Sequence, residues 1–216
     1  MRLQQQPREE VIIFTRYPEP GKVKTRLVPY LGEEKSARVH RLLTEQIIRL
    51  VQPLKQMRPV RISLFYTGGT LQKMETWLEE SIILAQQQGE NIGQRMAAAL
   101  RSAWLRGAHR AVLIGSDCPM IDADLLGQAL DRLRNHDVVL GPTYDGGYYL
   151  IGLNSNLSVE KFDMFFQKIA WGTAKVFHQT VQKAEKELLS IAILTTLHDI
   201  DRPEDLEYFS HYSDPQ

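Results

Sequence analysis

The stretch that most constrains the fold is Ala111 to Pro119, AVLIGSDCP, in which an aliphatic run ends in a small, polar and acidic turn. A continuous apolar run without polar alternation is typical of a strand in a parallel sheet that is covered on both faces. In open α/β sheets, ligands bind beyond the carboxyl ends of the strands. Asp117 follows this strand directly, so it is well placed to hold a cation that bridges phosphates. The alternative is that Asp117 caps the next helix.

The rest of the chain alternates between strand and helix patterns. Short apolar and β-branched runs predict further strands over residues 11–15, 60–66, 82–85, 137–141 and 190–195. Apolar residues at three- and four-residue steps predict helices over residues 31–55, 71–78, 97–107, 121–134 and 174–187. This alternation predicts an α/β fold. Residues 154–169 show no regular pattern, and Phe162, Phe165 and Phe166 are interpreted there as core residues.

Length and composition exclude several classes of protein. A chain of 216 residues suits one domain over residues 11–216, after a polar N-terminus over residues 1–10 that we expect to be disordered or frayed. Basic and acidic residues balance at 26 each, so no nucleic-acid partner is expected. No membrane span or secretory signal is recognised, and the single cysteine, Cys118, excludes an internal disulfide. We therefore expect a soluble, cytoplasmic protein. The sequence leaves its oligomeric state open, because no exposed heptad or apolar strip stands out.

The loop that follows the first predicted strand, RYPEPGKVKTRL, is rich in cations. Its prolines and glycine prevent regular structure. Arg16, Lys22, Lys24 and Arg26 would therefore gather at the carboxyl end of a strand, where they resemble a cradle for phosphates. A solvated basic loop is the alternative. We predict that these four residues bind the phosphates of a nucleotide.

A second glycine-containing passage, QQQGENIGQRM, precedes a helix. A glycine there allows close approach of a ligand, and we predict that Gly89 and Arg95 contribute to nucleotide or phosphate binding. The alternative is ordinary helix capping, because glycine and asparagine are common before a helix.

The passage PTYDGGYYLIGL allows two compatible interpretations. Asp145-Gly146-Gly147 is a strong signal for a hairpin turn. The same residues also suit a substrate site, in which Gly146 and Gly147 present backbone N–H groups and Asp145 accepts hydrogen bonds from sugar hydroxyls. Tyr148 is included in this predicted site.

Trp171 and Thr173 complete the predicted substrate site. Trp171 is suited to stack on a base or sugar, although a tryptophan that covers an edge of the core is the alternative. Thr173 stands before a predicted helix and is also a natural N-cap.

Four separated passages, RYPEPGKVKTRL, QGENIGQRM, LIGSDCP with GPTYDGGYYLIG, and DIDRPEDL, together resemble one family. They are similar to a bacterial, glycosyltransferase-like branch of the nucleotide-diphospho-sugar transferase superfamily, which has the glycosyltransferase A fold. The loop after the first strand also resembles that of phospholactate guanylyltransferases. The resemblance implies a three-layer α/β sandwich with a mixed, mostly parallel sheet.

The resemblance also implies a metal site that binds Mg²⁺ or Mn²⁺. Asp117 matches the metal-binding acid of the superfamily, which often appears as Asp-x-Asp, but Gly115 and Pro119 stand two positions to either side. The second ligand is expected in DIDRPEDL, with Asp201 preferred and Asp199 next. Carboxylates and a diphosphate suit these cations, whereas the six histidines show no spacing for zinc.

Three functions follow, of which transfer of a glycosyl group from a nucleoside-diphosphate sugar to a small acceptor is ranked slightly first. The second is nucleotidyl transfer from a nucleoside triphosphate to a phosphorylated small molecule, with release of pyrophosphate. The third is non-catalytic nucleotide binding. In both enzymes a metal ion at Asp117 would neutralise the charge of the leaving group, and Lys22, Lys24 and Arg26 would reinforce it. Asp145 is the first candidate for a general base.

Overall fold

The protein is described by a computed structural model over residues 7–78 and 82–210. Within these residues, seven strands form one sheet in the order β3-β2-β1-β4-β6-β5-β7. Only β6 runs against its neighbours, because it pairs antiparallel with both β4 and β5. The strands are β1 (Glu9–Arg16), β2 (Val60–Thr67), β3 (Ile83–Gln86), β4 (Arg110–Gly115), β5 (Val138–Pro142), β6 (Tyr148–Asn154) and β7 (Ile191–Ile193).

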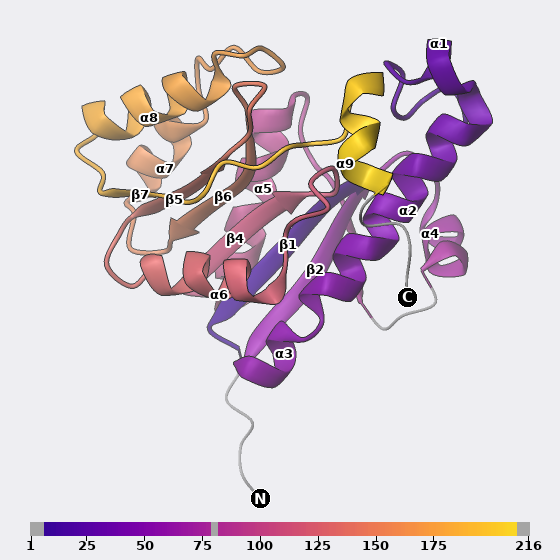
Figure 1. Cartoon of the computed structure of the whole chain (residues 1–216). Helices are drawn as coiled ribbons and strands as arrows, with labels where there is room; N and C mark the ends of the chain where they lie inside the picture. The colour runs from indigo at the N-terminus through magenta and orange to yellow at the C-terminus, as the bar shows by residue number, and fades with distance from the viewer. Residues whose placement is uncertain (1–6, 79–81, 211–216) are drawn as a thin grey trace, which may run out of the picture.

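Helices cover both faces of this sheet, which confirms the predicted three-layer α/β fold (Figure 1). One apolar core joins the sheet to α2 (Glu33–Val51), α3 (Leu54–Met57), α4 (Leu71–Trp77) and α6 (Ala123–Arg132). The other core joins it to α5 (Ile92–Leu105), α7 (Val159–Phe165) and α8 (Val176–Lys186). The remaining helical segments are α1 (Val28–Leu31), the short turn η1 (Pro203–Asp205) and α9 (Leu206–Ser210). Within the described ranges, none of these helices is long and apolar enough to cross a membrane.

The aliphatic run that precedes Asp117 forms β4 at the centre of the sheet. Ala111, Val112 and Ile114 are fully buried, as expected for a strand covered on both faces. The strand lies between parallel β1 and antiparallel β6, so Asp117 emerges at the edge where β1 also ends.

The first strand begins earlier than the apolar pattern indicates. β1 starts at Glu9, two residues before the predicted start, because Glu9 and Glu10 are buried as ion pairs. The Glu9 carboxylate binds Arg58 and Arg110, at 2.7 and 2.8 Å, so its charge is matched inside the fold. Residues 9 and 10 therefore belong to the sheet, while residues 1–6 of the predicted frayed terminus lie outside the described residues.

Two helix predictions need correction. The segment expected to be irregular contains α7, which Ser158 caps by accepting from Lys161 N at 3.3 Å. Thr173 is not the cap of α8: its hydroxyl donates to Ala170 O at 2.8 Å, and α8 begins at Val176. The predicted phenylalanine core is confirmed, since Phe162, Phe165 and Phe166 are all buried.

The segment after β7 crosses the carboxyl ends of the strands and brings the late aspartates to β4 (Figure 1). Leu194 N donates to Leu140 O at 2.8 Å, Leu197 N to Pro142 O at 3.1 Å, and Ile200 N to Asp117 O at 2.9 Å. These bonds place Asp199 and Asp201 beside the end of β4, although they lie far from it in sequence.

Candidate active site

A cavity of about 1040 Å³ lies over the carboxyl ends of β1 and β4 and the β5–β6 hairpin. The basic loop, the hairpin, the segment before α8 and the late turn all contribute to its wall. The predicted site residues that line it are Arg16, Lys22, Lys24, Arg26, Asp117, Asp145, Gly147, Tyr148, Trp171, Thr173 and Asp201. The acid after the central strand, the cationic loop and the double-glycine corner therefore share one cleft.

Gly89 and Arg95 do not line this cavity. Arg95 Nε donates to Gly89 O at 2.9 Å, so the two residues bind each other at the start of α5. Asn91 caps that helix by accepting from Gln94 N at 3.0 Å. The passage thus matches the capping alternative, and α5 presents Ile92 and Met96 to the cavity instead.

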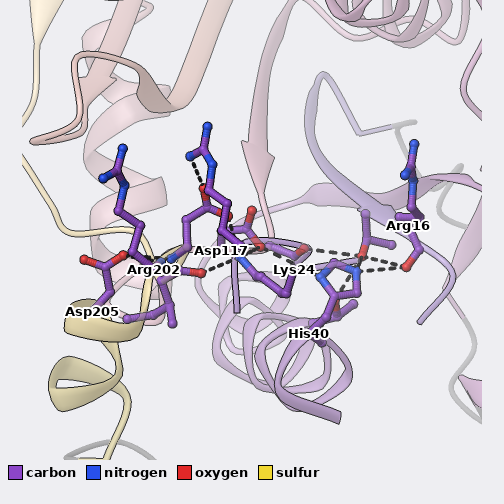
Figure 2. A network of polar contacts seen from close by, with 12 residues as sticks. Arg16, Lys24, His40, Asp117, Arg202 and Asp205 are labelled. Atoms are coloured by element: carbon purple, nitrogen blue, oxygen red, sulfur yellow. Dashed lines mark hydrogen bonds and ion pairs between the residues drawn. The ribbon is translucent and has the colours of Figure 1, made fainter. Parts of the chain in front are cut away.

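Lys24 and Asp117 form the centre of the site (Figure 2). The Lys24 side chain is only 3% exposed, and its Nζ lies 2.8 Å from Asp117 Oδ1. The ammonium also donates to Ile200 O and lies 3.9 Å from Asp201 Oδ1. Burial raises the pKa of Asp117, but the charge and hydrogen bond of Lys24 together with His40 outweigh it, and the net pKa falls below the usual value. Asp117 is therefore ionised at neutral pH.

The other cations of the loop are held by weak surface contacts. Lys22 pairs with Glu19 at 3.0 Å and is 65% exposed, and Arg26 pairs with Asp201. Arg16 donates to Lys22 O at 3.0 Å and to Thr67 Oγ1 at 3.3 Å. Because exposed pairs contribute little, a polyanion can compete for these cations.

Acidic groups face the cationic loop across the cavity. Asp145 Oδ1 accepts from Thr143 Oγ1 at 2.6 Å and from Gly147 N at 2.9 Å. Burial raises the pKa of Asp199 to about 6, and the charges of Asp145 and Asp117 add to this effect. The three aspartates are therefore close enough to repel one another. Among the described residues, no group of three histidine, cysteine or carboxylate side chains is preformed as a metal cage.

The double-glycine corner is a hairpin turn, and the N–H groups of Gly146 and Gly147 already donate hydrogen bonds within it. Gly146 N donates to Thr143 O at 3.1 Å, and Gly147 N donates to Asp145 Oδ1. The expectation that both N–H groups face a ligand is therefore corrected. Gly146 instead permits close packing, since its φ is 90° and an added Cβ would lie 2.2 Å from Ala174 O.

One wall of the cavity is apolar and aromatic. The Trp171 indole covers the start of α5, where a Cβ added to Gly93 would lie 2.5 Å from its Nε1. Tyr148 donates to Met96 Sδ at 3.9 Å, and burial raises its pKa. Trp171 thus covers an edge of the core, as the alternative interpretation has it, and also lines the cavity.

His40 and Arg202 also line the cavity, although neither is among the site residues predicted from the sequence. Arg202 and Arg16 lie on opposite sides of the Lys24 and Asp117 pair (Figure 2). His40 is 6% exposed on α2, and burial lowers its pKa although Asp117 opposes this shift. A signal for His40 was present: Ser36, His40 and Thr44 form a polar stripe at four-residue steps on the buried face of α2.

Comparison with known proteins identifies the family. The model of a family described as an uncharacterized protein conserved in bacteria, DUF2064, matches residues 50–173. The chain belongs to this family. A crystal structure described as a candidate nucleotide-diphospho-sugar transferase from Desulfovibrio desulfuricans G20 is 32% identical, with a TM-score of 0.84 over 96% of this chain and 89% of that one. This similarity confirms the predicted superfamily resemblance and fold.

Two other relatives are named as nucleotidyltransferases. A 2-phospho-L-lactate guanylyltransferase of Methanopyrus kandleri is 32% identical over 97 residues, which are 44% of this chain and 46% of the relative, so the match spans less than half of that protein. A nucleotidyl transferase from Methanothermobacter thermautotroptrophicus shares the fold, with 11% identity and a TM-score of 0.66 over 94% of this chain and 97% of that one. At 11% identity the Methanothermobacter structure shows the shared fold alone. The name of the Methanopyrus relative corresponds to the nucleotidyl alternative, which the sequence alone ranked second.

Proposed function

We propose that the protein is a nucleotidyltransferase that transfers a nucleoside monophosphate from a nucleoside triphosphate to a phosphorylated small molecule. The observation that carries this proposal is the gathering of Arg16, Lys22, Lys24 and Arg26 around one cavity, which suits a triphosphate. The partial similarity to a guanylyltransferase supports it. The apolar wall with Trp171 suits the base or sugar of the nucleotide.

In the proposed reaction, a phosphate oxygen of the acceptor attacks the α-phosphorus of the donor. A new O–P bond forms, the bond from the α-phosphorus to the bridging oxygen breaks, and pyrophosphate leaves with the electron pair. Lys24 is held by Asp117 and by Ile200 O before a ligand arrives, so its charge is preorganised to stabilise the transition state. Arg16, Lys22 and Arg26 would hold the remaining phosphate charge.

This chemistry removes the need for a general base. A phosphate monoester has a second pKa of about 6, so most of the acceptor is already doubly ionised at neutral pH. Asp145 is the first candidate for that role, but its Oδ1 already accepts hydrogen bonds from Thr143 and Gly147 in the hairpin turn. We therefore assign Asp145 to ordering the hairpin and to the acidic side of the cavity.

The acidic side suits a divalent cation such as Mg²⁺ or Mn²⁺. Carboxylate oxygens are the ligands these ions prefer. Burial is the main cause of the raised pKa of Asp199, and the charges of Asp145 and Asp117 add a repulsion that a bound cation would relieve. Asp201 is paired with Arg26 and lies 3.9 Å from Lys24, so two cations match its charge. Asp117 is paired with Lys24 through Oδ1, but its side chain is 45% exposed and can still face a cation in the cavity. We therefore place Asp117 and Asp199, rather than Asp117 and Asp201, as the residues that would hold the cation. When bound, the cation would neutralise charge on the phosphates.

The test is pyrophosphate release from each of the common nucleoside triphosphates with Mg²⁺ or Mn²⁺ and an acceptor panel. The panel contains 2-phospho-L-lactate, phosphoglycerate and glycerol phosphate, and ³¹P NMR identifies the product by the P–O–P linkage that joins the acceptor to the nucleotide. Lys24→Ala should lower kcat/KM by at least about 100-fold, because it removes a charge aimed at the transition state. Lys35→Ala, which changes an exposed lysine on α2, serves as the matched control.

Two outcomes would overturn the proposal. Release of a nucleoside diphosphate from sugar nucleotides, without release of pyrophosphate from any triphosphate, would show that the protein is a glycosyltransferase instead. Tight nucleotide binding with no turnover of any donor would support the non-catalytic alternative.

A further inference from the structure

A buried polar network lies directly beneath the Lys24 and Asp117 pair. It joins Thr15 at the end of β1, His40 and Thr44 on α2, and Ser116 after β4, each of which is at most 6% exposed. Thr15 Oγ1 lies 2.9 Å from Thr44 Oγ1, and Ser116 Oγ donates to Thr15 Oγ1 at 3.3 Å. Buried polar groups are costly unless they are bonded, so this network fixes how α2, β1 and β4 meet below the cavity.

The imidazole of His40 has one clear hydrogen-bond acceptor. Its Nε2 lies 2.9 Å from the carbonyl oxygen of Arg16 and 3.3 Å from Thr15 Oγ1. A carbonyl oxygen only accepts, so Nε2 must carry the proton. The other nitrogen, Nδ1, lies 3.9 Å from Asp117 Oδ1, which is beyond hydrogen-bond distance. His40 therefore acts on the backbone of Arg16 and not on the carboxylate.

His40 binds the carbonyl oxygen of Arg16, at the point where the chain leaves β1. Arg16 is the last residue of β1, and its guanidinium donates to Lys22 O at 3.0 Å. Fixing the Arg16 backbone therefore fixes both the Arg16 side chain and the start of the basic loop. Lys24 is less dependent on this bond, because its ammonium is held by Ile200 O and by Asp117.

We propose that His40 is a positioning residue for the donor triphosphate, and that it works through the Arg16 carbonyl. This inference rests on the proposed function, since it assigns Arg16 and Lys22 to donor phosphates. Loss of the bond should weaken triphosphate binding and raise KM for the donor. It should change kcat little, because Lys24 and Asp117 keep their own contacts.

Two substitutions separate the two nitrogens of the ring. His40→Gln places an amide nitrogen near the position of Nε2, within reach of the Arg16 carbonyl. His40→Asn ends near the position of Nδ1, on the Asp117 side. A role through Arg16 predicts that glutamine rescues binding and asparagine does not. His178→Asn, on the exposed face of α8, is the matched control.

Binding is measured by calorimetry with inorganic tripolyphosphate, and donor KM and kcat with the triphosphate that supports turnover. His40→Asn should weaken tripolyphosphate binding about tenfold, which corresponds to about 1.4 kcal/mol, and raise donor KM by a similar factor. His40→Gln should stay within about threefold of the wild type, and kcat of both variants within about twofold.

Several results would overturn the inference. Equal losses in the glutamine and asparagine variants would leave His40 with a structural role only, and rescue by asparagine alone would point to Asp117. If neither variant folds, ¹⁵N NMR of the wild-type imidazole decides, because a neutral ring protonated at Nδ1 contradicts the donor role of Nε2. Tripolyphosphate binding that follows this pattern without turnover of any donor would refute the proposed reaction and leave the role of His40 intact.

Discussion

The substitution Lys24→Met tests whether the central ion pair is organised as the structure has it. Methionine keeps most of the aliphatic length of lysine and removes its charge. The change leaves Asp117 Oδ1 and Ile200 O without the ammonium that contacts them. Within the described residues, this buried carboxylate oxygen has no hydrogen bond to replace it. The folded state should therefore lose stability in addition to any loss of activity.

The size of the effect follows from burial. Breaking a fully buried ion pair by removing one partner costs about 3–5 kcal/mol. Lys24 is 3% exposed but the Asp117 side chain is 45% exposed, so water compensates part of the loss. We expect the free energy of unfolding to fall by about 2 kcal/mol. Asp117→Asn should cost less, about 1 kcal/mol, because Lys24 keeps Ile200 O and lies 3.9 Å from Asp201.

Urea unfolding at pH 7.5 of the wild type, both single variants and the double variant measures the coupling. The double variant should lose at least about 1 kcal/mol less than the sum of the single losses. The pH dependence gives a second check. The pKa of Asp117 is lower in the folded protein than in the unfolded chain, so its ionisation stabilises the fold at neutral pH, and this contribution is lost as the pH falls. The gap between the wild type and Lys24→Met should therefore shrink below pH 3.8. Additive losses, or a gap that does not depend on pH, would refute the pairing.

Three further substitutions test other parts of the structure. Asp199→Asn should raise the free energy of unfolding by about 1 kcal/mol at pH 8 and not at pH 3.5, since a carboxyl with a raised pKa destabilises the fold only when ionised; urea titrations at both pH values measure this. Glu10→Gln should cost about 3 kcal/mol, because Glu10 is fully buried between Arg61 and Arg106. Gly146→Ala should cost at least about 2 kcal/mol in the same assay, through its φ of 90° and the contact with Ala174 O.

Each of these substitutions has a matched control. Asp201→Asn should bring no gain at pH 8, because it removes the partner of Arg26. Glu75→Gln, at an exposed position, and Gly115→Ala, where an added Cβ has nothing within 4 Å, should each change stability by less than about 0.5 kcal/mol. Equal effects of a substitution and its control would show that the burial and charge assigned to that site are wrong.

The fold could be predicted where local pattern and tertiary environment agree. The run that forms β4 is apolar because both of its faces are buried, and the sequence alone identifies it. β1 was placed two residues late because its first residues are acidic. Their burial depends on Arg58, Arg61, Arg106 and Arg110, which are distant in sequence. A charge that is neutralised by distant partners cannot be distinguished, in sequence, from one in water.

The same limit applies to the site. Asp117 and the basic loop could be placed together, because parallel neighbouring strands end at one edge of a sheet. The choice between Asp199 and Asp201 could not be made in this way. The two residues are separated only by Ile200, yet Asp201 pairs with Arg26 while Asp199 lies near Asp145 and Asp117. Only the path of the chain across the strand ends decides which carboxylate is neutralised.

The two ends of β1 differ in how their charges are matched, and this difference is itself an argument for function. At the amino end, Glu9 and Glu10 are each paired with two arginines and buried. At the carboxyl end, Lys24 has a left-handed φ of 47°, and Asp199 is repelled by its neighbours. Strain and unmatched charge of this kind lower stability and persist mainly where a ligand completes the site. The matched cluster lies at the amino end of β1 and the other lies beyond its carboxyl end, so the second is the place where a charged substrate gains most by binding.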